Sequence, residues 1–315
     1  MEAETTPRLP VIDLSNVDYL KPNTSEWDLV KSKVHKALEE YGCFEALFDK
    51  IPLDLRKAVF AALEQLFDLP LQTKQRNVSK KPFHGYIGQS SMQPLYESLG
   101  IEDSNFCEKV ESLTSILWPE GNPSFSKTML SFSEQVSELD AIIRRMVLES
   151  LGVENYLDEH MKSSSYLFRV TKYKGPQTKE TKLGLKSHKD KNLVTILYQN
   201  DVEGLEVQTK HGEWFVVKPS PESFIVMIGG SLVAWTNGRL YSPCHRVMMT
   251  GNEARYSTAL FSVPKGGYIT KAPEELVDEE HPLLYKPFDY AEFLKYFATE
   301  EGQKNEDAFK TYCGV

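Results

Sequence analysis

The sequence predicts a mixed α and β protein in which amphipathic helices wrap a β-rich core of the sandwich, jelly-roll or barrel type. The first observation is a change of pattern near residue 163, where helical spacing of apolar residues gives way to short strand-like runs. The second is the high frequency of turn residues between those runs, which is typical of such cores. The third is a return of helical spacing over 289–298.

Composition narrows the class of protein. The chain has 315 residues, of which 41% are hydrophobic and 26% are charged, so it can bury a sizeable core. Its net charge of −9 argues against nucleic acid as a partner, because a phosphate backbone requires clustered cations. The four cysteines form no CxxC pair, and we expect reduced thiols in the cytoplasm. We expect no signal peptide, because the first residues contain neither a basic nor an apolar stretch, and no apolar run approaches the roughly 18 residues that span a membrane.

The first part of the chain alternates strands and helices. We expect an edge strand over 9–14, a helix capped by Thr24 or Ser25, a strand over 43–48 and a helix over 53–67. Gly42 follows the first helix in the position that glycine favours after a helix end.

The middle part contains a long irregular stretch and then a long helix. Residues 71–104 are expected to be irregular, with Tyr86 and Tyr96 as candidates for lining a substrate pocket. Pro123 suits the first position of a helix, and apolar residues keep a helical period from there to about Leu151. This apolar stripe is interpreted as core packing.

The strand-like runs of the later part, in order, cover 166–174, 193–199, 204–207, 214–217, 224–228, 245–249 and 255–263. No repeat or linker separates them from the helices, so we expect a single domain over 1–315. Within it, 1–162 is mainly helical, 163–265 is the β core, and 266–315 is a C-terminal lid or helix segment.

A candidate metal site stands out in the β region. On a strand, His188 and Asp190 would point to the same face, and His245 begins a later strand. Two histidines and one carboxylate form the facial set that binds non-haem Fe(II) and leaves coordination positions open. A zinc hydrolase could use the same three ligands, but no general base stands at the expected spacing.

A candidate anion clamp follows ten residues after His245. Arg255 and Ser257 would share one face of a strand, and a guanidinium beside a hydroxyl suits the binding of a carboxylate. An open metal site and a carboxylate clamp in one barrel together suggest a dicarboxylate co-substrate.

The chain resembles the plant soluble 2-oxoglutarate/Fe(II)-dependent dioxygenases over nearly its whole length. The motifs that carry the resemblance are LPVIDL at 9–14, YGCF at 41–44, LGLKSHKD at 183–190, VEGLEV at 202–207, NGR at 237–239, SPCHRV at 242–247 and RYS at 255–257. The runs KYKGPQ at 172–177 and PEELVD at 273–278 look most like the AOP branch of specialised metabolism.

The resemblance implies a double-stranded β-helix, or jelly roll, wrapped by N-terminal and C-terminal helices. It implies Fe(II) as cofactor, 2-oxoglutarate and O2 as co-substrates, and ascorbate as reductant. Carried over residue by residue, the iron ligands are His188, Asp190 and His245. The residues for 2-oxoglutarate are Arg255, Ser257 and Tyr173, and Phe261 matches a position that often faces the substrate.

The implied reaction hydroxylates a small specialised metabolite and releases succinate and CO2, with desaturation and dealkylation as related outcomes. We expect a monomer that acts without a membrane or nucleic-acid partner. Two alternatives remain open: a catalytically silent ligand-binding protein on the same fold, and oxidation of glucosinolate side chains specifically.

Four residues depart from the family pattern. Thr171 stands where many relatives have asparagine. Lys189 replaces the usual threonine between His188 and Asp190, and we expect it to point away from the metal. Gly230 stands where aspartate is common. Lys186, two residues before His188, is either a solvated lysine or a contact for an anionic or polar substrate.

Overall fold

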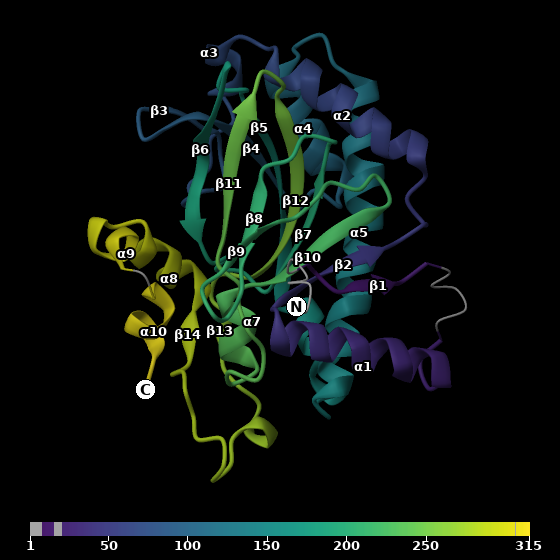
Figure 1. The fold of residues 1–315 in the computed structure, drawn as a ribbon, viewed down its shortest axis with the longest axis vertical. Coiled ribbons are helices and arrows are strands. Elements are labelled where there is room, and N and C mark those ends of the chain that lie inside the picture. The colour runs from purple at the N-terminus through teal and green to yellow at the C-terminus, as the bar shows by residue number, and fades with distance from the viewer. Residues whose placement is uncertain (1–7, 16–20, 306) are drawn as a thin grey trace, which may run out of the picture.

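The structure is a computed structural model that describes residues 8–15, 21–305 and 307–315 (Figure 1). In this part of the chain the larger sheet has the strand order β1-β2-β10-β7-β12-β5-β4-β3. Its strands are β1 (Val11–Asp13), β2 (Cys43–Leu47), β3 (Ile87–Ser90), β4 (Gln93–Glu102), β5 (Ser164–Tyr173), β7 (Val194–Gln199), β10 (Ser223–Ile228) and β12 (Arg255–Pro264). The pairing of β1 with β2 is parallel, and the other pairings are antiparallel.

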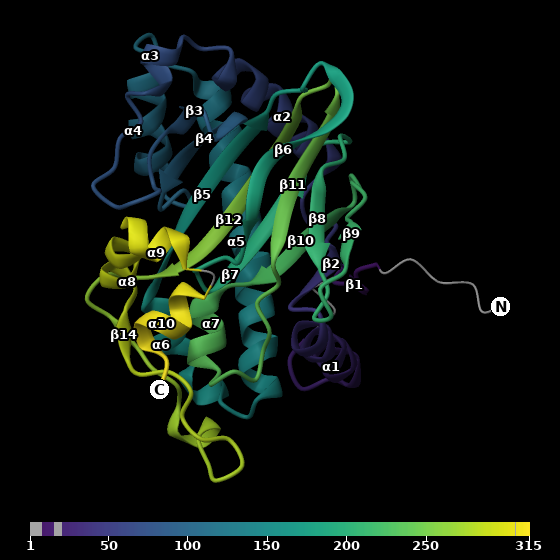
Figure 2. The same ribbon diagram turned by 60° about the vertical axis from the view of Figure 1, so that its left-hand side comes forward.

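A smaller sheet faces the first (Figure 2). Its strand order is β6-β11-β8-β9, with β6 (Thr178–His188), β8 (Leu205–Gln208), β9 (Trp214–Val216) and β11 (His245–Gly251). Buried side chains of both sheets meet between them, for example Val207 with Ile225, and Tyr173 with Val247. Two facing antiparallel sheets with this connectivity form a jelly roll. The predicted fold class is therefore confirmed.

Helices cover the outer face of the larger sheet and one end of the molecule (Figures 1 and 2). They are α1 (Ser25–Glu40), α2 (Leu53–Phe67), α3 (Leu71–Lys74), α4 (Cys107–Leu117), α5 (Pro123–Ser150), α6 (Leu157–Lys162), α7 (Gly230–Trp235), α8 (Tyr290–Phe297), α9 (Glu300–Lys304) and α10 (Ala308–Cys313). Short 3-10 helices occupy Glu154–Tyr156 and Glu274–Leu276, and β13 (Ile269–Thr270) pairs with β14 (Phe288–Asp289). No helix in the described ranges combines the length and the apolar content needed to cross a membrane.

Local sequence signals set the helix ends. The Thr24 side chain accepts a hydrogen bond from the Trp27 amide and caps α1. Gly42 follows α1 with φ of +70°, and a Cβ there would lie 2.2 Å from the Tyr241 carbonyl oxygen. Only glycine fits such a position. Asn122 caps α5, and Pro123 takes its first position, as the sequence predicts.

The main core lies between α5 and the larger sheet. Phe132 of α5 contacts the rings of Phe168 on β5 and Phe224 on β10, and all three are fully buried. The apolar stripe of this helix thus packs against the jelly roll. This contact confirms the interpretation of the stripe as core packing.

The expectation that residues 71–104 are irregular is wrong. β4 is a ten-residue strand that pairs with β5 over 96–102, and β3 pairs with β4 in turn. Pro94 and the polar residues of β4 concealed it, because its hydrogen bonds depend on a partner about 70 residues later in the chain. Together β2 and β4 attach the N-terminal part to both halves of the jelly-roll sheet.

Candidate metal centre and its pocket

Two histidines and an aspartate converge at one end of the smaller sheet. His188 ends β6 and His245 begins β11, and the two residues pair in register. Asp190 Oδ1 lies 3.6 Å from His188 Nε2 and 3.8 Å from His245 Nε2. Metal–ligand bonds of about 2.1 Å can join atoms up to about 4.2 Å apart. These distances therefore fit one cation held by all three residues.

Asp190 reaches this point from a loop. The strand expected to carry both His188 and Asp190 ends at His188, so alternation along a strand does not place the carboxylate. The Gly230 amide donates to the Asp190 carbonyl oxygen at 2.8 Å, and this bond fixes the loop backbone against α7. Thr195 Oγ1 donates to Asp190 Oδ2 at 2.5 Å, which leaves Oδ1 directed at the histidines. Sequence reasoning missed Thr195, although a threonine on an otherwise apolar strand was a signal.

Backbone carbonyls set the orientation of both imidazoles. His188 Nδ1 lies 2.9 Å from the Lys186 carbonyl oxygen, and His245 Nδ1 lies 3.5 Å from that of Pro243. A carbonyl only accepts, so each Nδ1 carries a proton and each Nε2 is the nitrogen directed at the metal position. Such partners hold metal-binding histidines in the ligand orientation.

The protonation states of His188 and Asp190 at neutral pH also suit a metal site. Desolvation, followed by the neighbouring His245, lowers the pKa of His188 to about 4, so this imidazole is neutral at pH 7. Burial acts to raise the pKa of Asp190, but His245, His188 and the Thr195 hydroxyl outweigh it and hold this pKa below its ordinary value. His188 therefore offers a neutral imidazole and Asp190 a carboxylate, and with the imidazole of His245 they form the donor set of an Fe(II) site.

A buried arginine lies on β12. Arg255 is fully buried, and Arg255 Nη2 donates to the Gln199 side-chain oxygen. Its Nε and Nη1 have no hydrogen-bond partner within the described part of the chain. Such donors are costly to leave unpaired, so they fit an incoming carboxylate. Gln199 was not identified from the sequence, although it too is polar on an apolar strand.

Two further predicted residues lie beside Arg255. Ser257 is buried two residues along the same strand, and the Tyr173 ring centre is 5.2 Å from the Arg255 guanidinium carbon. Burial lowers the pKa of Arg255, and the Tyr173 hydroxyl opposes that shift. The residues predicted for 2-oxoglutarate are thus brought together.

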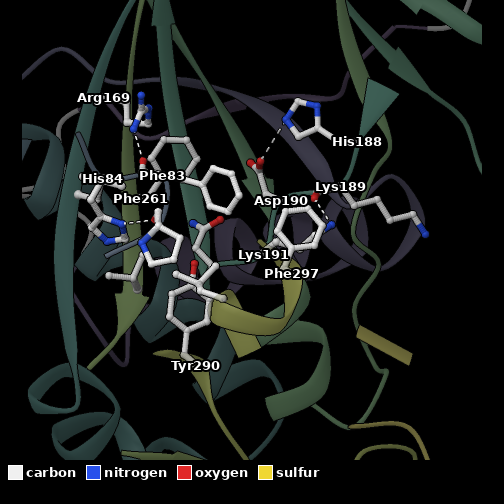
Figure 3. A pocket seen from close by; sticks show the side chains of 15 residues that line it. Phe83, His84, Arg169, His188, Lys189, Asp190, Lys191, Phe261, Tyr290 and Phe297 are labelled. Atoms are coloured by element: carbon white, nitrogen blue, oxygen red, sulfur yellow. Dashed lines mark hydrogen bonds and ion pairs between the residues drawn. The ribbon is translucent and has the colours of Figure 1, made fainter. Parts of the chain in front are cut away.

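A pocket of about 160 Å³ opens beside Asp190 (Figure 3). Its walls come from the loop at 82–84, from β12 and from α8, and they include Phe261 as predicted. Sequence reasoning missed the α8 residues Tyr290, Leu294 and Phe297, since only the tertiary fold brings this helix to the site. It also missed Lys191, which lines the pocket next to Asp190. Burial lowers the pKa of Lys191, while the Asp190 carboxylate opposes the shift.

Three other candidates lie outside this pocket. The Tyr86 hydroxyl donates to the Glu97 side chain at 2.8 Å, and the Tyr96 ring centre lies 5.5 Å from that of Tyr173. Lys186 is exposed. A shift of register between His188 and Leu185 breaks the alternation that would have placed Lys186 on the ligand face.

Lys189 points away from the metal ligands, as expected (Figure 3). Its ammonium lies 5.7 Å from the centre of the Tyr241 ring.

A jelly roll with two histidines and an aspartate at one end, and a buried arginine with unpaired donors beyond them, defines the class of Fe(II)- and 2-oxoglutarate-dependent oxygenases. Comparison with known proteins agrees. The model of the 2OG-Fe(II) oxygenase superfamily matches residues 153–264, and the model "non-haem dioxygenase in morphine synthesis N-terminal" matches residues 9–110. The chain belongs to the 2-oxoglutarate-dependent dioxygenase family. It is accordingly an oxidoreductase whose cofactor is Fe(II) and whose co-substrate is 2-oxoglutarate.

Three similar proteins illustrate the relationship. "Probable 2-oxoglutarate-dependent dioxygenase AOP1.2" of Arabidopsis thaliana is 56% identical over 312 residues, covering 97% of this chain and 96% of its own. "Probable inactive 2-oxoglutarate-dependent dioxygenase AOP2" of the same plant is 36% identical and covers 98% of both chains. The Arabidopsis thaliana dioxygenase for auxin oxidation 1, solved as a complex with 2-oxoglutarate, is 29% identical. Its TM-score is 0.79, over 87% of this chain and 100% of its own.

Proposed function

We propose that His188, Asp190 and His245 hold Fe(II), and that the protein hydroxylates a small specialised metabolite. The observation that carries this proposal is the convergence of the three ligand atoms, at 3.6 and 3.8 Å across Asp190 Oδ1. Bound iron would supply the activation of O2 and the oxidation of an unreactive C–H bond, with 2-oxoglutarate converted to succinate and CO2. Desaturation and dealkylation are related outcomes of the same chemistry.

The chain's own residues orient the reactants. Arg255 and Ser257 bind the distal carboxylate of 2-oxoglutarate, and Tyr173 stands against the guanidinium. The supporting observation is the pair of unpartnered donors on the buried Arg255. The aromatic walls around Phe261 and Phe297 exclude water and position the substrate carbon beside the metal set.

A catalytically silent binding protein is the main alternative. A chain named as probably inactive is 36% identical to this one, so the alternative is realistic. Loss of turnover would remove the need to keep the ligands, their Thr195 partner and the Arg255 clamp all intact, and this chain has every one of them. Glucosinolates, oxidised on their side chains, are one substrate class within the proposed activity.

The test is Fe(II)-dependent succinate formation from 2-oxoglutarate. Wild-type protein should form succinate, and His188→Ala or Asp190→Ala should reduce the rate at least about a hundred-fold, because each removes a metal ligand. Arg255→Gln should raise the KM for 2-oxoglutarate roughly ten-fold or more, since it removes a charge-assisted bidentate contact. Lys182→Met, an exposed change on the same β6 strand, is the control. Turnover that persists in both ligand variants would refute the site assignment.

We also propose that the protein is a monomer in the cytoplasm. All four cysteines are free thiols, which a reducing compartment favours. Light scattering during size-exclusion chromatography should give a mass near 36 kDa, and a mass twice as large would contradict the monomer.

A further inference from the structure

The pocket beside the metal set is apolar on most sides. Phe83, Phe261, Leu294 and Phe297 contribute rings or branched chains from three separate segments, and the Phe83 and Phe297 ring centres lie 5.7 Å apart. Figure 3 shows the aromatic rings gathered on one side of Asp190. Such walls suit a ring or alkyl group of a substrate.

The charges around this apolar space are unbalanced. The described lining residues include three cations, Arg169, Lys189 and Lys191, while Asp190 is their one carboxylate and is already assigned to the metal. An anionic group of a substrate would be attracted by any of these cations whose charge faces the pocket.

Two of the three cations have other tasks. Arg169 donates to the carbonyl oxygens of Phe83 and Gly85 and to the Ser98 hydroxyl, so it holds the loop that forms one wall. Lys189 points out of the pocket, toward Tyr241.

Lys191 is the cation that remains. Its Nζ donates to the Lys189 carbonyl oxygen at 2.7 Å and lies 4.9 Å from the centre of the Phe297 ring. Within the described ranges no salt bridge joins this ammonium to a carboxylate, and the charges of Asp190 and Asp307 act on it from a greater distance. An ammonium has three donors, so Lys191 keeps N–H groups for a ligand at the boundary between the metal set and the aromatic wall.

We propose that the substrate is an amphipathic anion, with a ring or alkyl part in the aromatic pocket and a carboxylate or sulfonate-type group bound by Lys191. The inference rests on the proposed function, because it concerns the substrate of the same metal site. It separates two anion positions: Arg255 binds the co-substrate in the buried interior, and Lys191 binds the substrate at the pocket. Arg255 is not among the residues that line the pocket.

A matched pair of probes isolates the charge: 2-naphthoate and 2-naphthamide have the same ring system and differ in the anionic group. Binding of each is measured by calorimetry under anaerobic conditions to protein loaded with Fe(II) and saturated with 2-oxoglutarate. Wild-type protein should bind 2-naphthoate about ten-fold more tightly than 2-naphthamide. Lys191→Met should abolish this preference, raising the Kd of 2-naphthoate about ten-fold and changing that of 2-naphthamide less than two-fold.

Two further variants make the result decisive. Lys295→Met removes a lysine on the same α8 helix that supplies pocket residues, but its Nζ is ion-paired with Glu292 at 2.6 Å, so the preference should persist. Lys191→Arg keeps the positive charge and should keep the preference for 2-naphthoate. This variant still tests the inference if Lys191→Met fails to fold.

Three results would overturn the inference: equal binding of both probes by wild-type protein, equal weakening of both by Lys191→Met, or loss of the preference in Lys191→Arg. Equal weakening would mean that Lys191 only shapes the loop through the Lys189 carbonyl. Failure of the proposed function is recognised separately, as wild-type protein that does not bind 2-oxoglutarate in the presence of Fe(II).

Discussion

Thr195 determines which oxygen of Asp190 faces the histidines. By donating to Oδ2 it occupies one side of the carboxylate and leaves Oδ1 for the cation. The carbonyl partners of His188 and His245 do the same for the two imidazoles, because each occupies Nδ1. Partners of this kind commonly contribute 10- to 100-fold in metal affinity. The metal site therefore depends on residues that are not ligands.

His160 gives the protein a pH-dependent stability. It is buried against Trp235, with ring centres 4.8 Å apart, and burial followed by the Arg144 charge lowers its pKa well below 6.5. The unfolded chain takes up a proton at this residue below pH 6.5 while the folded chain does not. The contribution of His160 to the free energy of unfolding is therefore fully present above pH 6.5. It falls as the pH decreases, by about 1 kcal/mol between pH 7 and 5.5.

Urea unfolding at pH 7 and pH 5.5 tests this prediction. His160→Gln should show a smaller loss of unfolding free energy between the two pH values than wild type, by about 1 kcal/mol. His211→Gln, which changes an exposed histidine, should lose as much as wild type. The same loss in His160→Gln as in wild type would show that the buried ring does not govern the effect.

At the level of elements, the C-terminal segment packs against the start of α7, which is hydrogen-bonded to the loop that carries the metal ligand Asp190. Gly230 begins α7, its amide holds the Asp190 backbone, and Phe309 of α10 packs directly over its Cα. A Cβ at residue 230 would lie 2.5 Å from a Phe309 ring carbon. A side chain at residue 230 therefore has no room, because α10 occupies the space that it would need.

Gly230→Ala should therefore lower the free energy of unfolding by roughly 1–3 kcal/mol, because the Phe309 ring must move within a packed cluster. Gly266→Ala is the matched control, since its Cβ would make an ordinary 3.4 Å contact with Ala291. The comparison uses urea midpoints and slopes of both variants. Equal stability of the two variants would mean that α10 moves aside at no cost.

Most jelly-roll strands after residue 163 were predictable because they are short buried runs between turn residues. β3 and β4 were not predicted, and β6 was not predicted over its full length, for physical reasons. β6 is an edge strand with mostly exposed residues, and β4 gains its hydrogen bonds from partners distant in sequence. The ligand set was predicted from the spacing of His188 and Asp190 together with His245, the Arg255 motif and the family resemblance. Thr195, Gln199 and Lys191 acquire their positions only when β7 and α8 reach the metal loop.

At the level of the whole molecule, helices and jelly roll share one sheet. β2 of the N-terminal part pairs with β10, and β4 pairs with β5, so neither part has a complete sheet without the other. Of the four tryptophans, Trp27 and Trp118 lie in the N-terminal part, and Trp214 and Trp235 lie in the jelly-roll part.

We predict that the two parts unfold together in urea. Transitions followed by tryptophan fluorescence in the double variants Trp27→Phe/Trp118→Phe and Trp214→Phe/Trp235→Phe should each coincide with the far-UV circular dichroism transition of the same variant, because a shared sheet makes unfolding cooperative. A fluorescence midpoint that separates from the circular dichroism midpoint in either variant would contradict a single cooperative unit.

The proposed assignment has His188, Asp190 and His245 holding the iron while Arg255 binds 2-oxoglutarate. Anomalous diffraction at the iron edge, from anaerobic crystals grown with Fe(II) and 2-oxoglutarate, locates both groups. We expect one strong anomalous peak within about 2.3 Å of both Nε2 atoms and one Asp190 oxygen, with a 2-oxoglutarate carboxylate on Arg255. A peak elsewhere, or 2-oxoglutarate bound without contact to Arg255, would show that this assignment is wrong.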